Sequence, residues 1–138
     1  MTSSTLPIRI VLWTIAAYHL IAGVAAVWFQ GTAVSIGSWL FGVNVTLTSQ
    51  AELLVRYLGA FGLSFALMAG LAALSPEKNR AILYGFVVYF AVRAFSRIAF
   101  WKLLDEHTVG PAPNWLRVIV ILIFATCLLV FMPRKQAA

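Results

Sequence analysis

Four long apolar runs constrain this chain more than any other feature of its sequence. Each is close to the roughly 20 residues that a helix needs to cross the hydrocarbon core of a bilayer. We predict membrane-spanning helices over about 8–29, 52–74, 78–101 and 115–132. Of the 138 residues, 62% are hydrophobic and only 10% are charged, and a soluble fold of this size could not bury so much apolar surface. The sequence therefore predicts an all-α fold: a single transmembrane domain, residues 1–138, built as an integral membrane four-helix bundle.

Capping residues mark the ends of these runs. Ser49 and Glu52 have the spacing of a capping box, which predicts Ser49 as the N-cap of the second helix. Ser75 followed by Pro76 predicts the N-cap and first residue of the third helix, joined to the second by a tight hairpin. Asn114 is the predicted N-cap of the fourth helix.

The connection between the first two spans, residues 30–51, is rich in Gly, Ser and Thr. Its segment Val43–Thr48 alternates apolar and polar residues as a strand does, but an isolated strand has nothing to pair with. We therefore expect an interfacial loop anchored by Trp39 and Phe41. The triplet that starts at Asn44 also fits a glycosylation sequon.

Basic residues are divided unequally between the two ends of the spans. Four spans put the N-terminus, the hairpin and the C-terminus on one side of the membrane. That side has five flanking basic residues and the other has three: Arg9, Lys78, Arg80, Arg134 and Lys135 against Arg56, Lys102 and Arg117. By the positive-inside rule, both termini are cytoplasmic. We expect a multi-pass protein of the cell inner membrane.

Several function classes find no support in the sequence. A net charge of +6 would suggest nucleic acid for a soluble protein, but the basic residues lie mainly at the ends of apolar runs, so we expect no nucleic-acid binding. The single cysteine, Cys127, matches no metal-ligand spacing, and we predict no metal site. No nucleophile elbow, phosphate loop or metalloprotease motif occurs. We predict no catalytic residue, and enzymatic activity is left open as the less favoured class.

Ionisable residues inside the third span are the main functional signal. Arg93 and Arg97 lie four residues apart with Tyr89 one turn earlier, so the three share one helix face. A charge at mid-membrane costs about 2.5–3.5 kcal/mol on insertion scales, so each needs an explanation. Arg56 and Glu52 enter the second span from the same side.

We predict that these five residues form a ligand-binding site in the outer leaflet. Guanidinium groups suit carboxylate, phosphate and carbonyl oxygens, so a quinone, a lipid or a small anion is the expected ligand. The alternative is structural. The arginines would then pair with Glu52 and the loop acids Asp105 and Glu106, or reach phospholipid headgroups.

His19 lies near the middle of the first span and completes the candidate ligand-binding residues. A mid-membrane histidine can ligate haem or bacteriochlorophyll, or relay protons. No second histidine falls within a span, which excludes bis-histidine haem ligation by one chain. The alternative is a neutral histidine that hydrogen-bonds across helices.

Small residues predict where the helices touch, because lipid provides no hydrophobic reason for helices to associate. Gly62, Ala66 and Gly70 recur on one face of the second span, and Ala22 and Ala26 on the first.

The layout resembles the DoxX-like group of small four-helix bacterial membrane proteins. The resemblance rests on the long first loop, on Arg56–Gly62 opening the second span, and on Arg93–Arg97 late in the third. It implies an accessory subunit of a membrane redox system, in some members linked to quinones, with Arg56, Arg93 and Arg97 as matching polar positions. The chain lacks the cysteine pair that a thiol-based redox role would need.

We therefore expect a non-catalytic accessory subunit of a larger, redox-type membrane complex. The alternative is a membrane binding module that holds a quinone, lipid or small anion at the arginine cluster. The expected partners are membrane lipids, together with a larger membrane-protein complex or further copies of the chain.

Overall fold

The computed structural model describes residues 5–41, 46–102 and 114–133. Every regular element in these ranges is a helix: α1 (Leu6–Trp28), α2 (Gln30–Phe41), α3 (Ser49–Leu74), α4 (Arg80–Ala99) and α6 (Asn114–Val130). The predicted all-α class is confirmed. Helices α1, α3 and α4 are long and apolar enough to cross a membrane, whereas α6 is apolar but shorter, at 17 residues.

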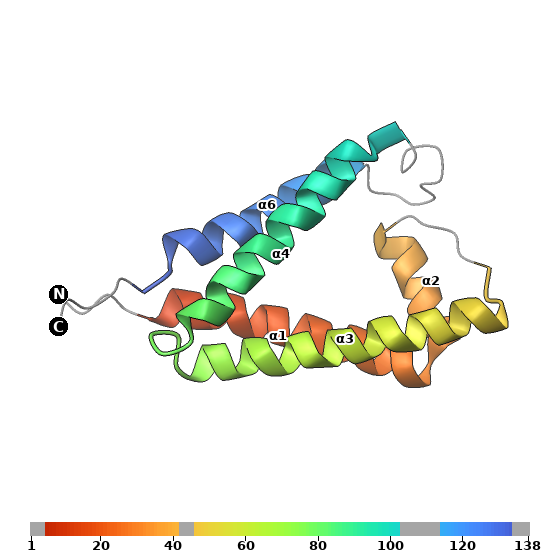
Figure 1. Cartoon of the computed structure of the whole chain (residues 1–138), viewed down its shortest axis with the longest axis horizontal. Coiled ribbons are helices and arrows are strands. Elements are labelled where there is room, and N and C mark those ends of the chain that lie inside the picture. The colour runs from red at the N-terminus through yellow and green to blue at the C-terminus, as the bar shows by residue number, and fades with distance from the viewer. Residues whose placement is uncertain (1–4, 42–45, 103–113, 134–138) are drawn as a thin grey trace.

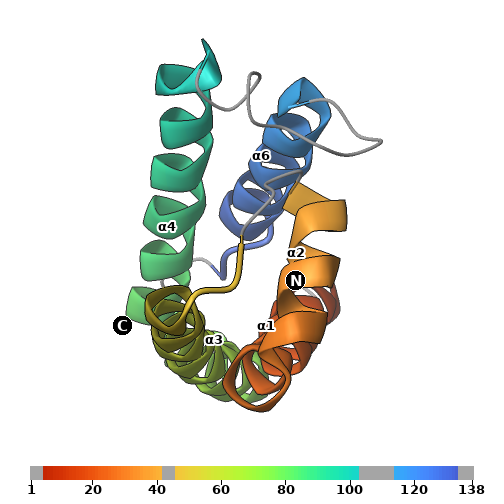
Figure 2. The ribbon, with the colours of Figure 1, turned by 90° about the vertical axis from the view of Figure 1, so that its right-hand side faces the viewer.

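The long helices form two antiparallel pairs that meet at one end of the molecule. Helix α1 packs along α3, and α4 packs along α6. Figure 1 shows the pairs converging where α1 begins, α3 turns into α4 and α6 ends; we call this the hairpin end. The pairs diverge toward the opposite end, the open end, where α2 folds back from α1. Figure 2 shows the same arrangement from the open end.

Helix α2 forms over residues 30–41, the first part of the segment 30–51 that was predicted to be a loop. The chain leaves the α1 geometry at Phe29, whose ψ of 58° breaks the helix, and then resumes a helix that packs mainly on α1. Glycine, serine and threonine are weak helix formers, but tertiary packing routinely overrides propensity. Residues 46–48 are not a strand, while residues 42–45, including Asn44 of the sequon, lie outside the described residues.

Helix α3 begins one residue earlier than its capping pattern predicted. Thr48, in extended backbone geometry, is the N-cap, and its hydroxyl accepts a hydrogen bond from the Ala51 amide at 3.2 Å. The N-cap role predicted for Ser49 is therefore wrong, and Ser49 is the first helical residue. Two hydroxyl residues in succession offer the same cap, and the backbone geometry at Thr48 decides between them.

The tight hairpin is present, but α4 starts at Arg80 rather than at Pro76. Ser75 is the C-cap of α3, not the predicted N-cap of the next helix. The Asn79 side chain donates to the carbonyls of Leu71 and Ser75 at 3.1 and 3.0 Å. It thereby satisfies carbonyls that the end of α3 leaves without helical partners. The residues between Ser75 and Asn79 form the turn.

The contact between α1 and α3 is made of glycines. A Cβ on Gly23 would lie 2.9 Å from the Leu63 amide nitrogen, and one on Gly59 would lie 2.9 Å from the Gly23 carbonyl oxygen. A Cβ on Gly62 of the predicted seam would lie 3.3 Å from the Gly23 Cα, so Gly62 also faces this contact. Ala22 is exposed, so its predicted packing role is wrong. Gly23, one residue or about 100° further around the helix, takes its place.

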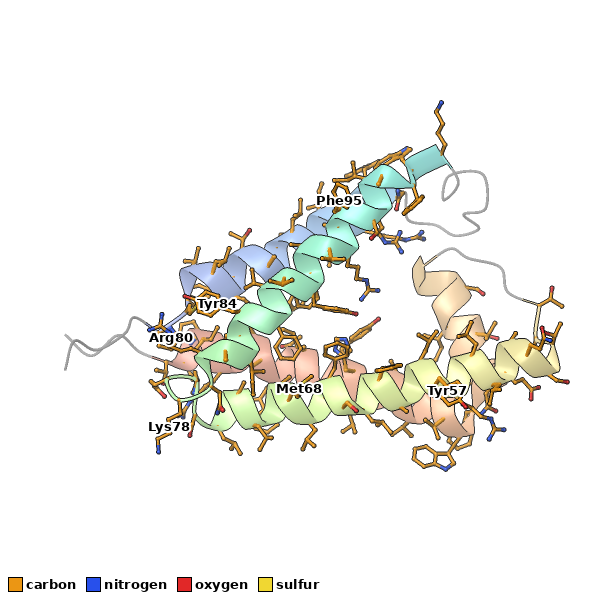
Figure 3. All side chains as sticks on the ribbon, in the orientation of Figure 1. Tyr57, Met68, Lys78, Arg80, Tyr84 and Phe95 are labelled. Carbon is orange, nitrogen blue, oxygen red and sulfur yellow. The ribbon has the colours of Figure 1, made fainter. Side chains whose placement is uncertain are left out.

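The buried apolar core draws on all four long helices. Leu12, Ala69, Leu83 and Leu128 are each fully buried in it. Large apolar side chains also cover the outside of the molecule, for example Phe95 (Figure 3), which is 70% exposed. An outer surface of this kind suits lipid, as the composition of the chain predicts.

Candidate functional site

Polar side chains of α1, α4 and α6 meet in the interior between the two helix pairs. On α4, Arg93 Nη1 donates a hydrogen bond to the Tyr89 hydroxyl at 3.2 Å, and its Cζ lies 6.0 Å from the centroid of that ring. The expectation that Tyr89 and Arg93 share one face of this helix is confirmed. The Tyr18 side chain of α1 lies close enough to the same guanidinium to interact with it.

Arg97, one turn further along α4, is held by α6. Its Nη1 donates to Asn114 Oδ1 at 2.7 Å, and Asn114 Nδ2 donates to the Arg97 carbonyl at 3.3 Å. The predicted N-cap role of Asn114 is wrong, because this residue is the first of α6 and its side chain is engaged with α4. Asn114 is only 1% exposed, and a polar side chain buried to this extent requires hydrogen-bond partners.

Arg117 is a functional candidate that the sequence analysis missed. It lies on α6, three residues after Asn114, and only 8% of its surface is exposed. Its charge is close enough to Arg97 to interact with it, as is that of Arg93. We call Arg93, Arg97 and Arg117 the arginine cluster. The sequence analysis counted Arg117 only as a charge that flanks the membrane. Its spacing of three residues from Asn114 places both side chains on one helix face, and this spacing is the signal that could have identified it.

His19 packs against this group through its ring and hydrogen-bonds within its own helix. Its Nδ1 lies 2.9 Å from the Ile15 carbonyl oxygen, so the hydrogen bond that the structure shows for this ring lies within α1 rather than across helices. The carbonyl four residues back is within reach of the ring, and no neighbouring helix is needed. Because a carbonyl only accepts, Nδ1 donates, and in the neutral ring Nε2 is an acceptor. The ring centroid lies 5.7 Å from that of Phe65 and 6.2 Å from that of Tyr89.

The polar residues lie at a common depth. Each helix covers about 20 Å, at roughly 1.5 Å per residue, between the hairpin end and its polar residue. The three segments run from Leu6 to His19, from Arg80 to Arg93, and from Val130 back to Arg117. Each of these distances starts from the hairpin end. In a hydrocarbon core about 30 Å thick, the cluster would lie in the half nearer the open end.

Glu52 and Arg56 do not join the arginine cluster. Both are exposed and lie near the start of α3, which Figure 1 shows on the opposite side of the open end from the last turns of α4. The predicted grouping of Arg56 with Arg93 and Arg97 is wrong, because no sequence pattern determines the angle at which two helix pairs diverge. The loop acids of the structural alternative, Asp105 and Glu106, lie outside the described residues.

A groove runs between α3 and α4 next to the cluster. Its volume is about 520 Å³, and Met68, on the α3 wall, is labelled in Figure 3. All its lining residues are apolar except Tyr89: Phe65, Met68, Ala81, Ile82, Gly85, Phe86, Val88 and Tyr89. The Tyr89 side chain therefore belongs to both the groove and the polar group.

The site concentrates positive charge on three guanidinium groups. Among the described residues, the Tyr89 hydroxyl accepts a hydrogen bond from Arg93, and the Asn114 amide oxygen accepts one from Arg97. Within the described ranges, no group of three or more His, Cys, Asp or Glu side chains could hold a metal ion. Guanidinium groups so arranged can bind an anion through charge-assisted hydrogen bonds.

Comparison of the chain with protein-family models, curated proteins and solved structures gave no match. The DoxX-like resemblance therefore stays a prediction.

Proposed function

We propose that this protein is a multi-pass membrane protein that binds an amphiphile with an anionic headgroup at the arginine cluster. The observation that carries the proposal is the convergence of three arginines from two helices, one of them 8% exposed, in the interior of an apolar fold.

The concentration of positive charge favours an anion as the ligand. Arg93 and Arg117 each lie close enough to Arg97 for their charges to interact with it. Like charges in an apolar region repel each other strongly, because little water screens them. An anionic phosphate or carboxylate between the guanidiniums would relieve this repulsion, and the planar donors match its oxygens.

The same charges favour one of the predicted ligand classes. A neutral quinone offers carbonyl acceptors but no negative charge, whereas an anionic headgroup offers both. Among the expected ligands, the cluster therefore supports an anionic lipid or small anion over a quinone.

The proposal includes the four-span topology, with α6 as the fourth span and both termini in the cytoplasm. Seventeen residues of helix cover about 26 Å, close to the thickness of a hydrocarbon core. The start of α1, the α3–α4 turn and the end of α6 share the hairpin end, as four alternating spans require. The basic residues near that end favour the cytoplasmic side.

Dodecyl phosphate, a simple anionic amphiphile, tests the proposal in neutral detergent. Arg93→Gln removes one charge of the cluster, and we expect roughly 10- to 100-fold weaker binding, because a charge-assisted hydrogen bond contributes about 1.5–3 kcal/mol. Native mass spectrometry across a ligand titration would measure the affinity. Arg56→Gln is the matched control, since Arg56 is exposed and outside the cluster, and its affinity should stay unchanged. A folded Arg93→Gln variant with wild-type affinity would contradict the proposal.

A further inference from the structure

We propose that the groove between α3 and α4 holds the hydrocarbon chain of the ligand, which reaches the site sideways from the bilayer. This inference rests on the proposed function of the arginine cluster. It adds the chemical class of the ligand, a long-chain anionic amphiphile rather than a water-soluble anion.

Tyr89 makes the groove and the cluster one continuous site. Its ring lines the groove and lies 4.8 Å, centroid to centroid, from the ring of Phe65 on the opposite wall. Its hydroxyl accepts the hydrogen bond from Arg93. A molecule that extends past this residue would pass from apolar surroundings to guanidinium groups, which is the polarity profile of an amphiphile.

The direction of the groove matches that of a lipid chain. Its α4 wall runs from Ala81 to Tyr89, about 12 Å along the helix, and the arginines follow Tyr89 on the same helix. With its headgroup at the cluster, a chain in the groove would extend along α4 toward the hairpin end. This direction is roughly along the membrane normal, as for the chains of the surrounding bilayer.

Gly85 gives the groove its space. Glycine is costly inside a helix, and at Gly23 and Gly59 close contact between α1 and α3 accounts for it. No close helix contact accounts for Gly85, because a Cβ built there would meet no atom within 4 Å. A side chain at this position would instead project into the volume between α3 and α4.

The charge at one end of the groove determines which occupant it favours. A hydrocarbon chain gains no hydrophobic free energy on moving from lipid into the groove, because lipid chains are equally apolar. The groove therefore selects its ligand in two ways: through van der Waals contact with the hydrocarbon chain, and through the anionic headgroup at the Tyr89 end. Neutral lipids would fill the same space without engaging the arginine cluster.

A pair of glycine substitutions tests the inference. Gly85→Leu fills the groove, and leucine favours the helix, so the variant should fold. Gly31→Leu is the matched control, because a Cβ at Gly31 also meets no atom within 4 Å and Gly31 lies on α2, outside the groove. We expect Gly85→Leu to weaken dodecyl phosphate binding about tenfold or more, a change of about one decade in Kd. Gly31→Leu should retain wild-type affinity, and both variants should keep the thermal unfolding temperature.

The outcomes separate this inference from the proposed function. If Arg93→Gln weakens dodecyl phosphate binding and Gly85→Leu does not, the cluster binds the headgroup and the groove assignment is wrong. If neither substitution changes binding, the proposed function fails. Inorganic phosphate provides a further measurement: binding as tight as that of dodecyl phosphate would show that the chain contributes nothing, and would overturn the inference.

Discussion

Arg97 and Asn114 hold each other through two hydrogen bonds between α4 and α6. Each side chain satisfies the other in a region where an isolated polar group would be costly. The pair joins residues 17 positions apart in the chain, and spacing alone did not reveal it. Sequence analysis singled out Arg97 as an ionisable residue within a span. It interpreted Asn114 by its position at the start of a helix, which concealed its contact with α4.

Removing the Asn114 side chain should destabilise the protein. Asn114→Ala leaves the Arg97 guanidinium without its 2.7 Å acceptor, so we expect a loss of about 1–3 kcal/mol. Thermal or chemical unfolding in detergent would measure it. In a double-mutant cycle with Arg97→Gln, the double variant should lose less stability than the sum of the two single variants, whereas simple additivity would show that the hydrogen bonds contribute nothing.

Helix α1 and helix α3 associate through small residues rather than interlocking large ones. Close approach of two backbones increases van der Waals contact, which lipid does not replace. The periodic small residues of the second span indicated this face correctly at Gly62 and Gly70, which lie next to Gly23 and Trp13 of α1. On α1 the predicted Ala26 lies at the contact with Gly59, but Ala22 is exposed and Gly23 takes its place. A short run of alanines and a glycine offers several equivalent faces, and only the partner helix determines which one is used.

Enlarging a glycine in this contact should separate the helices. Gly23→Leu would place its Cβ 2.9 Å from backbone of α3, and backbone cannot move aside as a flexible side chain can. We expect destabilisation of at least about 1–3 kcal/mol. Gly31→Leu, with open space at its Cβ, serves again as the control. A Gly23→Leu variant as stable as that control would rule out the close helix contact.

On the scale of the whole molecule, the two helix pairs diverge from the hairpin end, and the arginine cluster lies between them. This geometry makes an internal polar site compatible with an apolar exterior. The exposed apolar faces of the helices suit lipid chains and partner helices equally. The accessory-subunit hypothesis thus remains a prediction, and co-purification of a stoichiometric membrane protein from native membranes would support it.

Cysteine labelling in intact cells tests the proposed topology. In a Cys127→Ala background, which removes the single native cysteine, Lys78→Cys marks the hairpin end and Gln50→Cys the open end; both positions are exposed. We expect a membrane-impermeant maleimide to label Gln50→Cys in intact cells, and Lys78→Cys only after permeabilisation. The reverse pattern would place the termini outside the cytoplasm.

The sequence by itself determined the apolar helices, the tight hairpin and the presence of arginines within a span. These follow from local properties: run length, turn residues, and the cost of a charge among apolar neighbours. Tertiary structure alone decided that residues 30–41 form a helix on α1, that Arg117 joins Arg93 and Arg97, and that Arg56 does not. The reason is geometric, because periodicity places residues on a face of their own helix but contains no information about the angle between helix pairs. The groove beside Gly85 likewise exists only because α3 and α4 diverge from their common turn.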